Sequence, residues 1–265
     1  MARPIVALLS DFGSRDHYAG VMKGVILGLC PDATLVDISH DLPAHDIQAA
    51  ALELAASYKH FPAGTIFLVV IDPGVGTSRR GLVAEAGDWR FVAPDNGVLT
   101  AVFQEAPPKK VVELTERRYA RPTVSRTFEG RDRFAPAAGW LAKGGIQLPA
   151  FGRAVTDYQM LDLPKPQLDG SVLSGVVVRI DRFGNVVTNL DRRSCEKLTD
   201  GSGAVQLMVG GRSVGRIVAT YADIGADELG ALFGSTDHLE VAARASSAAE
   251  RLGVAAGAAV ELRRQ

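Results

Sequence analysis

The sequence predicts an α/β N-terminal domain built around a mostly parallel sheet, followed by a smaller all-β C-terminal domain. Up to about residue 150, short aliphatic and β-branched runs alternate with longer segments of helical periodicity, which is typical of βα units. Residues 65–71, TIFLVVI, are apolar throughout, as expected of a central parallel strand that is covered on both faces. After residue 170 the pattern changes to short strand-like segments separated by glycine-rich turns, which favours an all-β domain.

The elements of the N-terminal domain follow from periodicity and from the residues that begin and end helices. Pro31 ends the first expected helix, and Asp46 is a suitable N-cap for the second, which Pro62 ends. Asn96 and Gly97 mark a turn before a short third helix. The expected strands are 5–9, 34–38, 65–71, 82–85 and 90–93, and the longer helices are 17–29, 47–60 and 133–145.

A change of composition marks the boundary between the two domains. Residues 163–170, LPKPQLDG, hold two prolines between polar residues, as linkers do. We expect a first domain at residues 1–163, a linker at 164–170 and a second domain at 171–265. The expected strands of the second domain are 172–180, 186–190, 204–209, 216–221 and 239–243.

The charge balance and the two cysteines limit the classes of partner and compartment. With 29 basic and 30 acidic residues the formal net charge is -1, so neither nucleic acid nor an anionic membrane is an expected partner. Cys30 and Cys195 have no pairing or metal-binding spacing, which favours two buried thiols in a reducing compartment. The apolar run 5–9 reaches Asp11 too soon for a signal peptide or a spanning helix. A cytoplasmic protein with a small or zwitterionic partner is therefore expected.

Polar residues follow three of the expected strands. Asp11, Asp72 and the pair Asp95 and Asn96 each come after a strand, and open α/β sheets bind ligands at the carboxyl ends of their strands. These residues are therefore candidates for one shared crevice. The ionised carboxylate of Asp11 can accept both hydroxyls of a ribose, although from the local sequence alone a turn role is the more common one.

The glycine-rich loop at residues 72–80, DPGVGTSRR, carries a carboxylate and two arginines. Because its glycines permit a tight turn, Arg79 or Arg80 can fold back on Asp72 and hold the carboxylate. The loop lacks the Gly-Lys-Ser/Thr ending of a P-loop, so phosphate binding is not expected.

The sequence lacks the residues required for a kinase site, a metal site or a nucleophilic serine or cysteine site. The DFG of residues 11–13 is not accompanied by other kinase motifs, and no nucleophile elbow is present. His40 and His45 have no third ligand of comparable quality, so no metal site is expected. Neither cysteine has a basic partner nearby in the sequence.

Six segments of the chain carry distinctive motifs in a fixed order. They are LLSDFGSRDHYAGVMKGVI, VDISHDLPAHDIQAAA, FLVVIDPGVGTSRR, FVAPDNGVLT, RTFEGRDRFAPAA and RIDRFGNVVTNL. Together they resemble the motifs of the S-adenosyl-L-methionine (SAM) hydrolases that form adenosine, a family related to the SAM-dependent fluorinase and chlorinase. The resemblance is specific from Ile5 to about Leu190 and looser from there to the C-terminus.

The resemblance implies a fold, an assembly and a reaction. The fold is an α/β domain joined to a barrel-like β domain, which agrees with the change of pattern near residue 165. The assembly is a homotrimer whose active sites lie between the N-terminal domain of one subunit and the C-terminal domain of the next. The reaction is displacement by water at the ribose C5′ of SAM, which releases L-methionine and adenosine. SAM is the substrate, and no cofactor is implied.

The resemblance also assigns substrate-binding residues. Asp11 would hold the ribose hydroxyls with Phe12 beside it, and Asp95 and Asn96 would line the pocket. From the neighbouring subunit, contacts to the methionine or adenine portions would come from Asp181, Phe183, Asn185 and Ser235. Around Ser235 the match to the family is weakest, so recognition of the adenine edge is the least defined part of the site.

The catalytic trio of the family is an aspartate, an arginine and a histidine, and here the sequence departs from the pattern. Asp72 and Arg79 match the first two, but the F-x-G-R-D motif holds Glu129 where the family has histidine. Since the sulfonium leaves without a proton, the protein needs only to orient a water molecule and help to remove its proton.

Three roles are open for Glu129. It can replace histidine as the general base, because a carboxylate can accept a proton from water. It can instead pair with Arg79 and leave a slow or inactive protein that still binds SAM. The change can also mark a different substrate or nucleophile, or an engineered substitution. Halide transfer is disfavoured because Glu129 and Asp72 would both repel a halide. From the local sequence alone, Glu129 would pair with Arg131 or Arg133 in solvent. A working or weakened hydrolase is our leading hypothesis.

Overall fold

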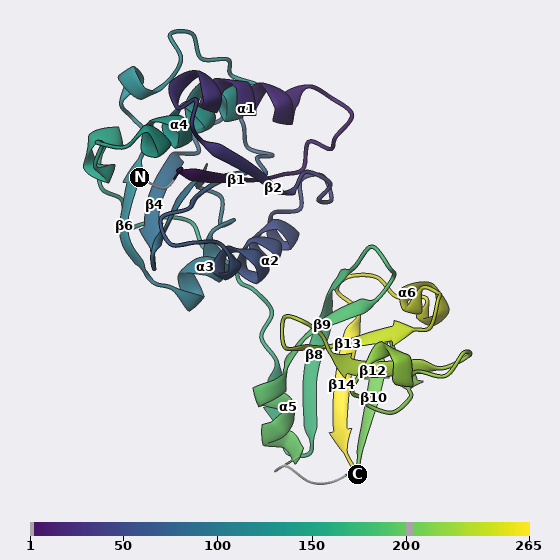
Figure 1. Cartoon of the computed structure of the whole chain (residues 1–265). Helices are drawn as coiled ribbons and strands as arrows, with labels where there is room; N and C mark the ends of the chain where they lie inside the picture. The colour runs from purple at the N-terminus through teal and green to yellow at the C-terminus, as the bar shows by residue number, and fades with distance from the viewer. Residues whose placement is uncertain (1–2, 200–203) are drawn as a thin grey trace. The chain divides into compact units, whose positions relative to one another are not determined.

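The chain forms two compact units, one from Met1 to Asp162 and one from Leu163 to Gln265 (Figure 1). The computed structural model describes residues 3–199 and 204–265. Each unit has its own sheet and its own buried core.

The first unit is an α/β domain with a mostly parallel, six-stranded sheet, as predicted. The strand order is β2-β1-β3-β5-β4-β6. The pairs β1–β2, β1–β3 and β3–β5 are parallel, whereas β4 is antiparallel to both β5 and β6. The strands are β1 (Ile5–Ser10), β2 (Thr34–Ser39), β3 (Ile66–Val70), β4 (Gly81–Ala86), β5 (Trp89–Pro94) and β6 (Pro108–Glu113).

Helices cover both faces of this sheet (Figure 1). α1 and α4 lie on one face, and α2 and α3 lie on the other. Asp46 caps α2 as expected, since its side chain accepts a hydrogen bond from Ala49 N at 2.9 Å. The helices are α1 (Tyr18–Leu29), α2 (Ile47–Ser57), α3 (Thr100–Glu105) and α4 (Ala135–Lys143), with 3₁₀ turns at Tyr58–His60, Arg117–Tyr119 and Leu148–Phe151.

A π-helical turn from Gly130 to Phe134 precedes α4, so the helical segment begins before the predicted helix of residues 133–145. Gly130 lies against the core: an added Cβ would stand 3.1 Å from Val70 Cγ1 and 3.2 Å from Met22 Sδ. Since such turns occur often at functional sites, this deviation directs attention to Glu129, which immediately precedes it.

The second unit is a barrel-like antiparallel sheet, as predicted. Its strand order is β11-β10-β14-β8-β9-β13-β12, and β7 pairs with β8. Aliphatic side chains such as Val177, Val241 and Leu262 fill its core. The strands are β7 (Gln167–Asp169), β8 (Val172–Ile180), β9 (Val186–Asp191), β10 (Val205–Val209), β11 (Arg212–Val214), β12 (Leu229–Phe233), β13 (His238–Ala243) and β14 (Ala259–Arg264), and the helices are α5 (Arg192–Thr199) and α6 (Ala248–Leu252).

The prediction for this unit did not include β11, β12, β14, α5 or α6, and it was wrong for two further segments. Residues 167–169 of the expected linker form β7. Residues 216–221 are not a strand, because only Ile217 forms a bridge, to Ala231, and Thr220 and Asp223 form a capping box that begins a 3₁₀ turn. Tyr221 in this turn donates its hydroxyl to the buried carboxylate of Glu240. Side-chain hydrogen bonds therefore hold this segment where a sheet ladder was expected.

Cys30 and Cys195 are both buried and free. Burial raises the pKa of the Cys195 thiol to about 12. Within residues 3–199 and 204–265, no helix is long and apolar enough to cross a membrane.

Candidate active site

Two loops of the first unit meet at the carboxyl ends of neighbouring parallel strands. β1 and β3 are paired up to Ser10 and Val70, so Asp11 and Asp72, which follow them, leave the same edge of the sheet. A cavity of about 220 Å³ lies there. Its walls include Asp11, Phe12, His45, Asp72, Phe128 and Glu129. The structure thus brings together four of the residues singled out from the sequence.

Arg79 connects two of the three carboxylates of this cavity, those of Asp72 and Glu129. Its Nε donates to Asp72 Oδ1 at 2.8 Å, and its Nη2 contacts Asp72 Oδ2. The same Nη2 lies 2.7 Å from Glu129 Oε2. All three side chains are largely buried, at 6% exposure for Asp72, 10% for Arg79 and 12% for Glu129. The predicted fold-back of an arginine onto Asp72 is confirmed, and that arginine is Arg79.

A second guanidinium group reaches Glu129 from the π-turn. Arg133 Nη1 donates to Glu129 Oε2 at 3.0 Å, and Arg133 Nη2 donates to the carbonyl of Leu114 at 2.5 Å. Of the two local partners considered for Glu129, Arg133 is therefore the one that pairs, since Arg131 binds Asp132. The cluster holds two carboxylates and two guanidinium groups, whose formal charges cancel.

The two oxygens of Glu129 differ in their contacts. Oε2 is shared by Arg79 and Arg133. Within the part of the chain that the structure describes, Oε1 has no hydrogen-bond partner, and it is not among the buried atoms that lack one. One oxygen of the carboxylate is thus fixed, and the other is free to take a proton or a water molecule.

The environment of Arg79 keeps it charged. Burial opposes the charge of its guanidinium group, but the hydrogen bonds and charge of Asp72, with those of Glu129, outweigh this effect and raise its pKa. The ring of Phe134 lies 5.2 Å from the guanidinium carbon. Arg79 Nη1 is buried without a hydrogen-bond partner among the described residues.

Asp11 and Phe12 also line the cavity. Asp11 Oδ2 accepts a hydrogen bond from His45 N at 2.8 Å. His45 has a φ of 67°, a left-handed conformation that is uncommon for histidine and is often found at functional sites. The ring of Phe12 packs at 5.3 Å from Tyr18 and 5.8 Å from Phe128, measured between centroids. Phe128 and His45 stand in two of the motifs described above, but their contribution to this cavity was not predicted from the sequence.

Asp95 and Asn96 lie outside the lining of this cavity. Asp95 is buried and accepts from Arg80 Nε at 2.7 Å and from Gln159 N at 2.8 Å. Asn96 Nδ2 donates to the carbonyl of Ile71 at 2.8 Å, directly before Asp72. In the first unit both residues brace the sheet edge, and their role as substrate ligands stays a prediction.

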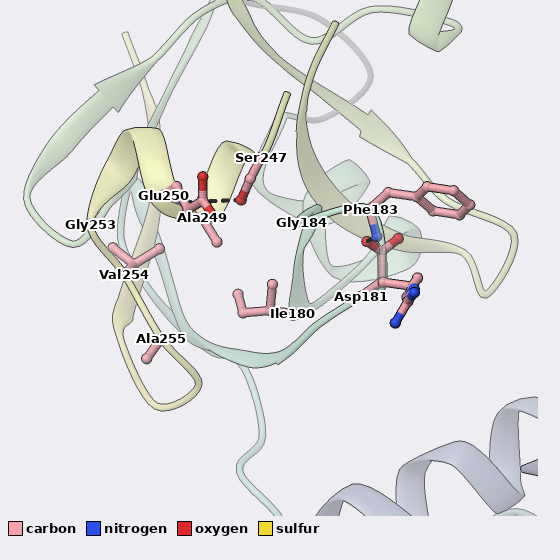
Figure 2. Close-up of a pocket in the computed structure, with 11 residues that line it drawn as sticks. Ile180, Asp181, Phe183, Gly184, Ser247, Ala249, Glu250, Gly253, Val254 and Ala255 are labelled. Carbon is pink, nitrogen blue, oxygen red and sulfur yellow. Dashed lines mark hydrogen bonds between the residues drawn. The ribbon is translucent and has the colours of Figure 1, made fainter. Parts of the chain in front are cut away.

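The second unit has its own cavity, of about 630 Å³, next to the turn after β8 (Figure 2). Asp181 organises this turn: its Oδ1 accepts from Phe183 N at 2.8 Å and Asn185 N at 2.9 Å, and its Oδ2 accepts from Asn185 Nδ2 at 2.9 Å. Phe183 is 78% exposed and extends away from Val254 on the other side of the cavity. The turn therefore presents the exposed ring of Phe183 on a backbone that the hydrogen bonds of Asp181 hold in place.

Other residues of this cavity come from α6 and the loop after it. Ser247 caps α6 by accepting from Glu250 N at 3.1 Å. Gly184 packs so closely on Ser247 that an added Cβ would stand 2.3 Å from its Oγ. Ser235 lies in the turn between β12 and β13 and does not line this cavity. Three of the four residues that the resemblance assigns to this half thus share one turn, and Ser235 stands apart.

Comparison with known proteins gives a consistent result. The family model described as the SAM hydroxide adenosyltransferase N-terminal domain matches residues 6–152, and the corresponding C-terminal model matches residues 175–261. The chain is 38% identical to the (R)-S-adenosyl-L-methionine hydrolase of Thermus thermophilus, over 98% of this chain and 99% of that protein. It is 31% identical to a fluorinase of an Actinoplanes species, over 73% of this chain and 74% of that protein.

A solved structure has the same fold. The crystal structure of an uncharacterized conserved protein from Thermotoga maritima superposes with a TM-score of 0.92 at 35% identity, covering 98% of this chain and all of that chain. Both halves of the family model and full-length relatives therefore agree with the motifs read from the sequence. The chain belongs to the SAM hydroxide adenosyltransferase family.

Proposed function

We propose that this protein hydrolyses SAM to adenosine and L-methionine in the cavity at the ends of β1 and β3. The observation that carries the proposal is the buried cluster of Asp72, Arg79 and Glu129, found in a chain whose full length is 38% identical to a SAM hydrolase. SAM has a cationic sulfonium, and the carboxylates of Asp11, Asp72 and Glu129 line a cavity suited to a cation.

The proposed reaction is a direct displacement by water, so the protein does not need to form a covalent bond to the substrate. A water oxygen bonds to the ribose C5′ while the C5′–S bond breaks, and the sulfur keeps the bonding electron pair as the neutral thioether of methionine. The water loses one proton, and the leaving group needs none. Catalysis therefore depends on an oriented water molecule, on removal of that proton and on exclusion of bulk solvent.

Each residue of the cluster has a proposed role in that step. Asp72 and Arg79 position the water, and Glu129 Oε1 accepts its proton while Oε2 stays bound to Arg79 and Arg133. The two guanidinium groups compete with that proton for the same carboxylate. We therefore expect a working enzyme whose turnover is slower than that of a relative with histidine at this position.

Substrate binding completes the proposal. Asp11 accepts the ribose hydroxyls, with Phe12, Asp95 and Asn96 shaping the pocket around them. The protein assembles as a homotrimer, in which a neighbouring copy contributes residues of its second unit to the methionine and adenine ends of SAM: Asp181, Phe183, Asn185 and Ser235. No cofactor takes part. The two free cysteines fit a reducing compartment, and the cytoplasm is the proposed location.

Incubation of the purified protein with SAM tests the proposal. Chromatography should detect adenosine and methionine in equal amounts, formed in proportion to protein concentration. The second candidate is an impaired protein that binds SAM without cleaving it, and the ion pair between Arg79 and Glu129 is the observation that favours it. SAM binding in a calorimeter without release of adenosine would establish that candidate and contradict the hydrolase.

A further inference from the structure

A chain of polar side chains lies directly behind the Asp11 loop. Ser10 Oγ is 2.6 Å from His40 Nδ1, and His40 Nε2 is 3.0 Å from Asp37 Oδ1. Lys23 Nζ donates to Asp37 Oδ2 at 2.6 Å. Ser10 is fully buried and His40 is 9% exposed. None of these four residues has a role in the proposed function.

An irregularity between β1 and β2 makes this arrangement possible. Leu8 pairs with Asp37 but Leu9 pairs with Ser39, so β2 contains one extra residue at Ile38. Successive side chains of a regular strand alternate between the two faces, and a bulge of one residue shifts that alternation. Asp37 and His40 can therefore face the same side, where His40 reaches Ser10 at the end of β1.

The direction of the hydrogen bonds follows from the donors and acceptors present. Burial opposes the charge of Asp37, but hydrogen bonds from Lys23 and His40 outweigh this effect and lower its pKa, so the carboxylate is ionised and only accepts. His40 Nε2 must then carry its hydrogen. In the neutral imidazole Nδ1 is left to accept from the Ser10 hydroxyl.

Ser10, His40 and Asp37 are hydrogen-bonded in the same order as a catalytic triad, but a substrate cannot reach the buried serine. A nucleophilic serine must reach its substrate, whereas the side chain of Ser10 has no exposed surface. Its remaining contact is to the backbone, since Phe12 N lies 3.4 Å from Ser10 Oγ. The carbonyl of His40 accepts from Gly13 N at 2.7 Å. One histidine thus holds both ends of the loop that carries Asp11.

We propose that His40 is a positioning residue for the substrate: through Ser10 Oγ and through its own carbonyl it fixes loop 11–13 and so aims the Asp11 carboxylate into the cavity. This inference rests on the proposed role of Asp11 in SAM binding. The only other bond that holds Asp11 within the described residues comes from His45 N. Loss of the link between His40 and Ser10 should loosen the loop and weaken binding without changing the reacting groups.

Two substitutions of the same histidine separate positioning from general packing. His40→Asn keeps an amide near the place of Nδ1 and can still bond Ser10, whereas His40→Gln reaches toward Asp37 and loses Ser10. We expect KM and Kd for SAM to rise about tenfold in His40→Gln and in Ser10→Ala, the usual effect of one lost hydrogen bond, with kcat within about threefold of wild type. His40→Asn should stay within about threefold of wild type in all three constants.

A matched control removes a buried hydroxyl from the other end of the same sheet. Thr65 is 1% exposed, precedes β3 and donates to the carbonyl of Pro62 at 2.8 Å. Thr65→Val should lower Tm by a few degrees, much as Ser10→Ala does, but leave KM and Kd unchanged. An equal rise of KM in Thr65→Val, or an unchanged KM in both Ser10→Ala and His40→Gln, would overturn the inference.

Hydrogen exchange in the ligand-free protein tests the loop independently of catalysis. The amides of Phe12 and Gly13 should exchange faster in His40→Gln and Ser10→Ala than in wild type, His40→Asn or Thr65→Val. Unchanged exchange at these amides would contradict the inference whatever the protein binds. A wild-type protein that binds neither SAM nor adenosine would instead contradict the proposed function, and with it the substrate part of this inference.

Discussion

Arg133 Nη1 lies 3.0 Å from Glu129 Oε2, which gives this carboxylate a second guanidinium partner besides Arg79. The arrangement neutralises the negative charge of Glu129, at the position where the resemblance implies a histidine. It also fixes one carboxylate oxygen and leaves the other without a hydrogen bond to any described residue. Whether Glu129 acts as a base or only as a counter-ion can therefore be tested by changing it and Arg133 separately.

Replacing Glu129 with the family residue should raise turnover. Glu129→His frees Arg79 from its second carboxylate and supplies a base that two guanidinium groups do not hold, so we expect kcat to rise about tenfold or more. The adenosine released under saturating SAM measures this. A kcat equal to or below that of wild type would identify Glu129 as an adapted base.

Removal of Arg133 should increase activity if Oε1 of Glu129 accepts the proton. Arg133→Met keeps much of the side-chain volume but removes one of the two charges that compete for the carboxylate, so kcat should rise about threefold. Arg153→Met is a suitable control, because Arg153 pairs with Glu113 at an exposed position away from the cavity. A fall in kcat at unchanged Tm would mean that Arg133 holds Glu129 in its productive orientation.

Chloride should not replace water as the nucleophile. Asp11, Asp72 and Glu129 line the cavity, whereas the two arginines that pair with the last two do not, so the lining should repel a halide although a fluorinase is among the relatives. Chromatography of a reaction in molar sodium chloride should contain adenosine and no 5′-chloro-5′-deoxyadenosine. Detection of the chlorinated nucleoside would show that Arg79 and Arg133 outweigh the carboxylates at the attacking position.

Asp132 should make the stability of the first unit depend on acid pH. Its fully buried carboxylate accepts from Arg131 Nε at 2.7 Å and from Ser125 N at 2.8 Å. Burial opposes its charge, but the hydrogen bonds from Arg131 and Ser125 outweigh this effect and lower its pKa from the ordinary value of 3.8. The ionised form is therefore favoured by folding, and its contribution is complete above that value and declines as the pH falls below it.

Urea unfolding of Asp132→Asn tests this pH dependence. At pH 7 the variant should be about 2 to 4 kcal/mol less stable than wild type, because Arg131 and the Ser125 amide lose a charged acceptor. Comparison with the variant cancels the contribution of the other carboxylates. The difference should shrink as the pH falls from 4 toward 2, and a difference that stays constant over this range would contradict the role of Asp132.

The features that were predicted correctly are those that depend on residues close together in the chain. Three of them are confirmed: the buried apolar strand Ile66–Val70, the Asp46 cap of α2, and the ion pair between Arg79 and Asp72. β6 was missed because Pro108 and two lysines open it, a composition that does not resemble a strand.

The parts of the site that were not predicted depend on tertiary contacts. One partner of Asp95 is Arg80, fifteen residues earlier and directly before the neighbouring strand β4, and no local pattern indicates that pairing. One of the two partners of Glu129, Arg133, is four residues away, but the sequence cannot tell an exposed pair from a largely buried one. Only the fold buries this i, i+4 pair and places Glu129, one of its two members, in the lining of the cavity.

The π-turn from Gly130 to Phe134 makes the site sensitive to chain length as well as to residue type. Such a turn holds one residue more than an α-helical turn, so deleting one residue would leave an α-helical turn and remove the geometry that joins Glu129 to α4. We expect activity to fall although every catalytic residue type remains. Enzyme engineers who graft this segment onto another member of the family should therefore transfer residues 128–135 as one block.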